Sequence, residues 1–343
     1  MNREGGAREL NLTLSALPRE PNAPLRRLPL VTLYLSERCN SRCRTCDYWR
    51  YGRADLDLAA VSRLVPSLHR LDTRTVLLSG GEPLLNRQWA EIASLLTGEG
   101  LEVWLLTSGL SLAKHARQAS TLFRSITVSL DGTDPATYAA IRGVDAFEVV
   151  CRGIRSAVDC GVPVTVRVTL QRANFRQLVS FVDLTRQLGV RQVSFLAVDV
   201  ANPHAFGRQE GFESGLALQP GELQELDALM LALERDRSEA FSSGFIAENP
   251  RKLRRILQYF SAVCGLDAYP PVRCNAPEFS AVVDAKGHVS PCFFIAGPAD
   301  ACSRDGLDQA LDRSDMVALR TAIRAGERPE CATCVCSMWR EGA

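Results

Sequence analysis

Long apolar runs, net charge and histidine are all scarce in this sequence of 343 residues. No stretch approaches the ~18 consecutive apolar residues that a transmembrane helix needs. The N-terminus also lacks the apolar core behind a basic start that marks a secretion signal. A net charge of +1 provides no general attraction to nucleic acid or to an anionic membrane. We therefore expect a cytoplasmic protein that binds neither.

Cysteine, in contrast, is abundant, with twelve in the chain against four histidines. Thiols stay reduced in the cytoplasm, so many cysteines there indicate metal ligation rather than disulfide bonds. Three lie within Cys39–Cys46 and three within Cys331–Cys336. Hydrophobic residues make up 46% of the chain and charged residues 23%, which is typical of a globular protein and excludes a largely disordered one.

Apolar runs bounded by turn residues alternate with segments whose apolar residues recur at helical spacing. The predicted strands are 30–35, 75–79, 102–107, 125–130, 163–170 and 192–198. The predicted helices between them are 56–69, 87–98, 111–119, 135–159 and 174–188. This alternation predicts an α/β fold, a partial (β/α)6 TIM-like barrel, with its chemistry at the C-terminal ends of the strands.

The alternation stops near residue 200, and the rest of the chain follows other patterns. The expected parts are an N-terminal arm (1–28), the barrel core (29–199), a loop and helical extension (200–263) and a small C-terminal domain (264–343). The extension is expected to hold helices near 220–235 and 250–262. The C-terminal domain is expected to hold a β-hairpin over 279–284 and 287–293 and a last helix near 307–325.

The first cysteine cluster follows the first predicted strand. Cys39, Cys43 and Cys46 have the spacing C-x3-C-x2-C on a loop, where three thiolates can converge. Iron–sulfur clusters normally use four thiolates, so three protein ligands on a [4Fe–4S] cluster leave one iron open. A zinc site or buried thiols are the alternatives. Zinc sites usually combine C-x2-C pairs or add histidine, and none of the four histidines lies near this loop.

A three-cysteine loop after the first strand of a partial barrel resembles the radical S-adenosylmethionine (SAM) superfamily. The resemblance implies that Cys39, Cys43 and Cys46 hold a [4Fe–4S] cluster whose open iron binds SAM. Reductive cleavage of SAM would give a 5′-deoxyadenosyl radical, which abstracts hydrogen from the substrate. In the family, the residue before the third cysteine is usually aromatic and contacts the adenine of SAM. In this sequence that position is occupied by Thr45, which is not aromatic.

The ends of later strands carry elements that are similar to SAM-binding motifs of the same family. G-G-E-P follows the second strand, T-S-G the third, and S-L-D-G and then R-G the fourth. The implied SAM contacts are Gly80, Gly81, Glu82, Ser108, Ser129 and Arg142. Each element also has an ordinary structural alternative. G-G-E-P can simply form a turn, Arg142 can be a solvated helix residue, and Asp131 can cap the following helix. Arg167, a charge in an apolar strand, is a further candidate for the SAM carboxylate, the substrate or an ion pair.

The C-terminal cysteines resemble the auxiliary-cluster domains called SPASM and, in shortened form, twitch. The spacing from Cys274 through Gly287 to Cys292 matches the first half of the SPASM pattern, whereas the second half departs from it. A twitch-like domain with one auxiliary [4Fe–4S] cluster is the better match. Its implied ligands are Cys274, Cys292, Cys331 and Cys334, with Cys336 as the substitute for Cys334. On spacing alone, a four-cysteine zinc site is equally compatible. Packing thiols are expected at Cys151 and Cys160, whereas Cys264 and Cys302 stay unassigned.

The resemblance implies a radical SAM oxidoreductase-type enzyme that takes electrons from a donor such as flavodoxin or ferredoxin. We expect oxidation of a small molecule, of the dehydrogenase type. Radical modification of a peptide side chain (oxidation, epimerisation or cross-linking) is the alternative, although about 28 residues before the first strand are too few for a leader-binding domain. A non-enzymatic zinc or redox-sensing protein is a third possibility, which the SAM motifs disfavour. No motif identifies a general base or a substrate contact. The basic residues within 251–255 indicate a solvated helix face or a contact with an acidic partner.

Overall fold

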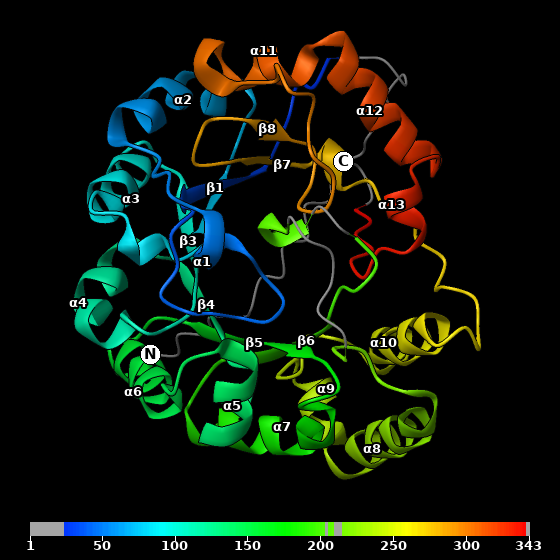
Figure 1. Cartoon of the computed structure of the whole chain (residues 1–343). Coiled ribbons are helices and arrows are strands. Elements are labelled where there is room, and N and C mark those ends of the chain that lie inside the picture. Colours follow the sequence, from blue (N-terminus) through cyan, green and yellow to red (C-terminus); the bar gives the residue numbers. More distant parts are fainter. Residues whose placement is uncertain (1–23, 203–204, 209–214, 341–343) are drawn as a thin grey trace, which may run out of the picture.

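The structure is a computed structural model that describes residues 24–202, 205–208 and 215–340 (Figure 1). Most of the expected N-terminal arm therefore lies outside the described residues. Within the described part, no helix combines the length and the apolar character that crossing a membrane requires.

The predicted strands form one curved sheet that stays open at both edges (Figure 1). The strands are β1 (Leu30–Ser36), β2 (Thr75–Gly80), β3 (Glu102–Thr107), β4 (Ser125–Ser129), β5 (Val164–Leu170) and β6 (Gln192–Ala197), followed by β7 (Ser280–Val283) and β8 (Val289–Ser290). Their order is β6-β5-β4-β3-β2-β1-β7-β8, and β1 to β6 are parallel. The predicted α/β fold with a partial TIM-like barrel is confirmed.

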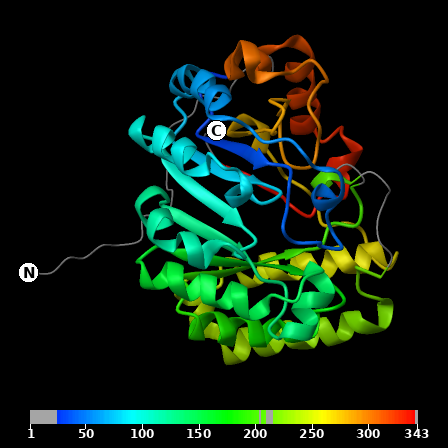
Figure 2. The same cartoon turned by 60° about the vertical axis from the view of Figure 1, so that its left-hand side comes forward.

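Helices cover the outer face of the sheet, as the two views of the cartoon show (Figures 1 and 2). They are α2 (Leu58–Arg70), α3 (Trp89–Gly98), α4 (Leu112–Leu122), α5 (Pro135–Arg142), α6 (Phe147–Asp159) and α7 (Leu178–Gln187). Apolar side chains alternate along the strands, and on β1 Val31, Leu33 and Leu35 are fully buried. The residues between them point to the opposite, concave face, because successive strand side chains alternate.

The predicted helix over 135–159 is two helices, and this break shapes the site. Gly143 ends α5 with a left-handed φ of 67°, a conformation that glycine adopts without strain. A Cβ atom at Gly143 would lie only 2.2 Å from the carbonyl oxygen of Arg42. The break therefore lets the three-cysteine loop lie directly against the end of α5.

The chain after β6 returns to the sheet at both of its edges. Helix α10 (Pro250–Val263) packs against β6, α8 (Leu223–Asp236) packs against α7 and α10, and α9 (Ser238–Ser242) follows α8. Val193 of β6 pairs with Ile246 in the same region. The predicted hairpin forms as β7 and β8, and β7 pairs in parallel with β1. The C-terminal segment is thus continuous with the main sheet.

The last predicted helix, over 307–325, is also divided. It forms α11 (Leu307–Asp312) and α12 (Ser314–Ala325), and two short helices, α1 (Tyr48–Tyr51) and α13 (Pro329–Ala332), lie elsewhere in the chain. Arg313 separates α11 from α12 with an extended ψ of 142°. The break allows α11 to pack on α2, where Asp308 accepts hydrogen bonds from Ser67 and Arg70, while Arg324 of α12 reaches Glu278 at 2.9 Å.

Candidate functional site

The three-cysteine loop connects β1 to α1 and is held in place by the end of α5. The backbone amide of Arg42 donates to the carbonyl of Arg142 at 2.8 Å, and that of Arg44 donates to Ile141 at 3.1 Å. Hydrogen bonds of this kind fix the loop backbone before any group is bound. The loop is thus an ordered feature of the fold.

The three thiols of the loop lie close enough to affect one another electrostatically. Burial raises the pKa of Cys39 to about 11, with Cys43 and Glu82 adding to the shift. Burial also raises the pKa of Cys43 and, together with Cys43 and Cys39, that of Cys46. Thiols in such surroundings ionise when a metal binds, because the metal charge stabilises the thiolates.

Glu82 joins the ends of β2 and β3 beside this loop. It is fully buried and accepts hydrogen bonds from the Thr107 hydroxyl at 2.8 Å and from the Ser108 amide at 2.7 Å. The Ser108 hydroxyl donates to Asn40 of the loop at 3.1 Å. Glu82 and Ser108 therefore form a connected polar group between the strand ends and the loop.

Gly80 and Gly81 lie against the start of the loop. Gly80 has a φ of 117°, and a Cβ atom there would lie 2.5 Å from the carbonyl oxygen of Ser36. A Cβ atom on Gly81 would lie 2.4 Å from the carbonyl oxygen of Arg38. The two glycines are thus required by contact between backbone segments, which the G-G-E-P pattern alone did not reveal.

Arg142 is buried next to the loop, so it is not a solvated helix residue. Its guanidinium pairs with Asp131 at 3.1 Å, and 12% of its side chain is exposed. Burial acts to lower the pKa of Arg142, but Cys43 and Asp131 outweigh it and raise the pKa. Asp131 does not cap α5, because Asp134 accepts the hydrogen bond from the Thr137 amide and is the cap. Ser129 ends β4 next to this pair and is partly exposed.

The C-terminal cysteines converge on one small, mostly apolar cavity. All four expected ligands line it, and so does a fifth thiol: Cys274, Cys292, Cys331, Cys334 and Cys336. Burial raises the pKa of Cys292 to about 12, with Cys274 and Cys331 adding to the shift. Cysteines from distant parts of the chain therefore line the same cavity.

Asn275 brings the terminal segment to this cavity. Its side chain donates to the carbonyl of Arg340 at 2.8 Å and accepts from the Arg340 amide at 2.9 Å. Its backbone amide donates to Met338 at 2.9 Å. Asn275 was not singled out in the sequence, although its position directly after Cys274 was the available signal.

Comparison with known proteins identifies the barrel. Residues 33–185 match the model of the family described as the radical SAM superfamily. This chain contains a radical SAM domain. The match covers the strands and loops that carry the three-cysteine loop, Glu82, Ser129 and Arg142. The resemblance found in the sequence is confirmed for residues 33–185, and a match to this family implies SAM and a [4Fe–4S] cluster as cofactors of the matched domain.

Curated proteins match about half of the chain. A probable GTP 3′,8-cyclase of Saccharolobus solfataricus is 33% identical over 178 residues, and one of Methanococcus maripaludis is 28% identical over 172. The match covers 48% of this chain in both cases, and 56% and 57% of those proteins. The chain thus spans little more than half the length of the curated relatives it matches.

Solved structures resemble the chain over most of its length. Streptococcus suis SuiB bound to S-adenosylmethionine has a TM-score of 0.66 at 14% identity and covers 91% of this chain and 73% of its own. The anSMEcpe enzyme with bound AdoMet and a Cp18Cys peptide has a TM-score of 0.65 at 17% identity, covering 89% and 86%. At these identities the likeness establishes the fold.

In the radical SAM barrel, Arg167 lies in one row with two serines on the concave face. Arg167 is on β5, where it pairs in register with Ser129 of β4 on one side and with Ser194 of β6 on the other. Its Nε atom is buried without a hydrogen-bond partner. Burial lowers the pKa of Arg167, which Glu248 and Cys336 partly oppose. Arg167 therefore lies beside Ser129 and one strand further than Ser129 from β1, which leads into the three-cysteine loop.

Tyr34 of β1 lies between the two groups of cysteines. Burial raises its pKa, and Cys46 of the first group and Cys292 of the second both add to the shift. Its ring meets that of Tyr48 edge to face, with the centroids 5.9 Å apart. Sequence reasoning did not single out either tyrosine, although the alternation of β1 points Tyr34 into the concave face.

The remaining cysteines lie outside both groups. Cys151 is buried in α6, as expected of a packing thiol, and Cys160 caps the end of that helix. Cys264 donates to the Leu218 carbonyl at 3.3 Å. In the part of the chain that the structure describes, no three Cys, His, Asp or Glu side chains are close enough to share a single metal ion.

Proposed function

We propose that this protein is a radical SAM enzyme that cleaves S-adenosylmethionine reductively and takes a hydrogen atom from its substrate. The observation that carries the proposal is the ordered loop of Cys39, Cys43 and Cys46 beside the buried cation Arg142. Its thiols are buried or half-buried, lie within electrostatic reach of one another and are partly balanced by that cation. When bound, the cluster supplies the electron that cleaves SAM, and the remaining chemistry is that of SAM itself.

The proposed SAM contacts follow from charge and position. The Glu82 carboxylate is held by Thr107 and Ser108 next to the loop, where its charge attracts an ammonium group. Arg142 supplies a fixed positive charge that balances the thiolates and attracts a carboxylate. Ser108 and Ser129 offer hydroxyl groups at the same strand ends, and Gly80 and Gly81 keep the backbone close to the loop.

We further propose one auxiliary [4Fe–4S] cluster at Cys274, Cys292, Cys331 and Cys334, in a twitch-like domain over 264–343 that follows the barrel core (29–199) and the extension (200–263). The convergence of these thiols on one cavity supports it. Each thiolate of such a cluster binds a different iron, so its ligands stand further apart than those of one zinc ion. Cys334 and Cys336 are both near enough to serve, and Cys336 alone also lies within electrostatic reach of Arg167 and Lys252.

The reaction on the substrate is the finer part of the proposal. The curated relatives are named probable GTP 3′,8-cyclases, and this name does not favour a dehydrogenase. A closed auxiliary cluster favours oxidation, because it can accept the electron that a substrate radical releases. We propose a small-molecule substrate, with flavodoxin or ferredoxin as electron donor. Modification of a peptide side chain is the second candidate, since the anSMEcpe structure was solved with a bound peptide.

Anaerobic purification tests the proposal directly. We expect a brown protein with about eight irons per chain, the content of two [4Fe–4S] clusters. With dithionite and SAM it should form 5′-deoxyadenosine even without substrate. A colourless protein that binds zinc and leaves SAM intact would refute the proposal.

A further inference from the structure

Two arginines on the concave face of the barrel have different surroundings. Arg142 pairs with Asp131 and is influenced by Cys43 and Cys39 of the three-cysteine loop. Arg167 is influenced instead by Glu248 and by Cys336 of the C-terminal group. The first arginine therefore belongs to the SAM side of the barrel, and the second faces the side where the C-terminal segment closes it.

Arg167 has no partner within the described part of the chain. Its Nε atom is buried without a hydrogen bond, and none of its nitrogens approaches a carboxylate within 4 Å. Glu248, the carboxylate that opposes the lowering of the Arg167 pKa, is already engaged, because it accepts from the Ser194 hydroxyl and from the Phe195 amide, each at 2.7 Å. The guanidinium therefore retains its donors for another group.

An unpaired guanidinium inside a protein is unfavourable, because burial removes its water without supplying an acceptor. Its planar set of donors matches the two oxygens of a carboxylate or a phosphate. Of the two serines beside Arg167 in the same row, Ser129 adds a hydroxyl group, whereas the Ser194 hydroxyl already donates to Glu248. The row can thus hold an oxyanion with one charged donor, the guanidinium, and one neutral donor.

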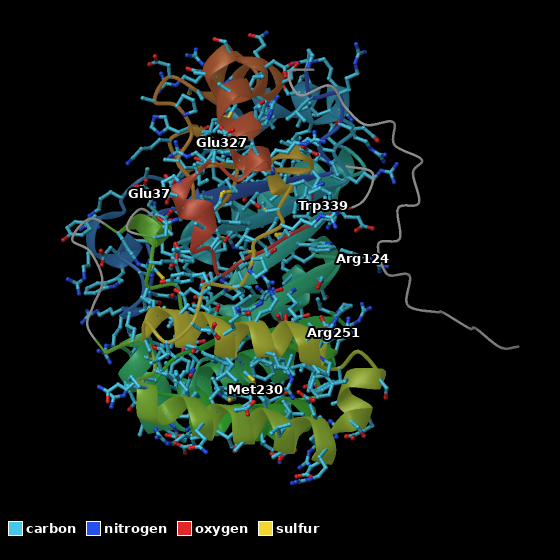
Figure 3. The ribbon with its side chains drawn as sticks, turned by 90° about the vertical axis from the view of Figure 1, so that its right-hand side faces the viewer. Glu37, Arg124, Met230, Arg251, Glu327 and Trp339 are labelled. Carbon is cyan, nitrogen blue, oxygen red and sulfur yellow. The ribbon has the colours of Figure 1, made fainter. Side chains whose placement is uncertain are left out.

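The region next to Arg167 is also positive. Lys252 is close enough to influence Cys336, as Arg167 is. Lys252, Arg255 and Arg273 line one pocket with Tyr259 and Trp339, and among the described residues no carboxylate side chain lines it. Figure 3 shows Trp339 on the terminal segment and Arg251 on α10, the two elements that border this pocket. Cations without acids around a pocket attract anions.

We propose that Arg167 binds an anionic group of the substrate, a phosphate or a carboxylate, on the β5–β6 side of the barrel. The proposal rests on the proposed function and names the substrate class of that same site. The substrate is then a small anionic molecule whose charged end lies at Arg167, while Arg142 and Glu82 bind SAM. The basic pocket beyond the terminal segment raises the local concentration of such molecules.

The test uses the full-length, anaerobically purified holoenzyme and two probe anions, inorganic phosphate and acetate. Thermal unfolding is followed with increasing anion at constant ionic strength, with chloride as the reference. We expect the wild type to be stabilised by one probe, which identifies the anion class. We expect Arg167→Gln to raise the apparent Kd for that probe about tenfold or more, and Arg167→Lys to recover part of the response.

A matched control and a second measurement make the result decisive. Arg235→Gln removes an exposed arginine paired with Asp236 and should respond like the wild type. The proposal is overturned if neither probe stabilises the wild type, or if Arg167→Gln responds as the wild type does. It is equally overturned if Arg167→Gln weakens SAM binding tenfold, since Arg167 would then serve SAM. Failure of the wild type to cleave SAM would instead refute the proposed function.

Discussion

Arg142 of α5 donates to Asp131 at 3.1 Å, and both side chains are almost completely buried beside the three-cysteine loop. Asp131 in turn accepts from the Thr169 amide of β5 at 2.7 Å. One ion pair thus joins the ends of α5, β4 and β5 at the point where the loop backbone is anchored. Its charge also lies next to the thiols that we propose as cluster ligands.

Breaking this pair should cost more than breaking an exposed one. We expect Asp131→Asn or Arg142→Gln to lower the free energy of unfolding by about 3–5 kcal/mol, because each leaves an uncompensated buried charge or donor. Urea denaturation of the anaerobic protein measures the change. The exposed pair of Arg235 and Asp236 is the control, and Asp236→Asn should leave the free energy of unfolding almost unchanged. Equal costs for the two pairs would contradict the assignment.

The three cysteines of the loop should each be necessary for SAM cleavage. In Cys39→Ala we expect the iron content to fall from about eight to about four per chain, with loss of 5′-deoxyadenosine formation. Iron analysis and chromatography of the products measure the two effects. Cys160→Ala, which removes a thiol outside both groups, should keep both iron and activity. Persistent SAM cleavage in Cys39→Ala would refute the mechanism.

Cys334 and Cys336 can be separated by the same iron analysis. Cys334 is influenced by Cys292 and Cys274, whereas Cys336 also lies near Lys252 and Arg167, toward the barrel. We therefore expect Cys334→Ala to lose about four irons and Cys336→Ala to retain them. The reverse result would make Cys336 the ligand.

Asn275 should matter through the terminal segment that it holds. Asn275→Ala removes two side-chain hydrogen bonds to Arg340 and should lower the free energy of unfolding by about 1–3 kcal/mol. We also expect faster loss of auxiliary-cluster iron to a chelator, because the terminal segment carries Cys331 and Cys334. The first cluster should lose iron at the wild-type rate. Parallel loss from both sites would indicate general unfolding instead.

Asp308 should make stability depend on acid pH. Hydrogen bonds from Arg70 and Ser67 hold the pKa of Asp308 well below its usual range. A carboxyl whose pKa is lower in the folded state stabilises the protein fully above its unfolded pKa of about 3.9, and this contribution declines as pH falls from that value through the lower pKa of the folded state. We expect Asp308→Asn to cost about 1 kcal/mol at pH 7, because the pair is partly exposed. The difference from wild type in unfolding experiments should shrink toward pH 3; a constant difference would exclude this role.

Much of the barrel was predictable because each strand and helix is indicated by the pattern of apolar residues within its own segment. The run 30–35 predicts a strand, and β1 is Leu30–Ser36 in the structure. The break after α5 was missed, since an isolated glycine within a periodic segment does not by itself end a helix. Gly143 ends α5 because the backbone of Arg42, a hundred residues earlier, lies against it.

The sequence by itself determined the cysteine spacings, the motifs after the strands and the period of each strand and helix. These depend on neighbouring residues, which chain connectivity brings together. Only the tertiary structure decided which side chains meet: Glu82 with Ser108, Asn275 with the terminal segment, and Arg142, but not Arg167, with a carboxylate. Those contacts depend on the sheet register and on the return of the C-terminal segment to β1. Both join residues that are far apart in the chain, so no short stretch of sequence predicts them.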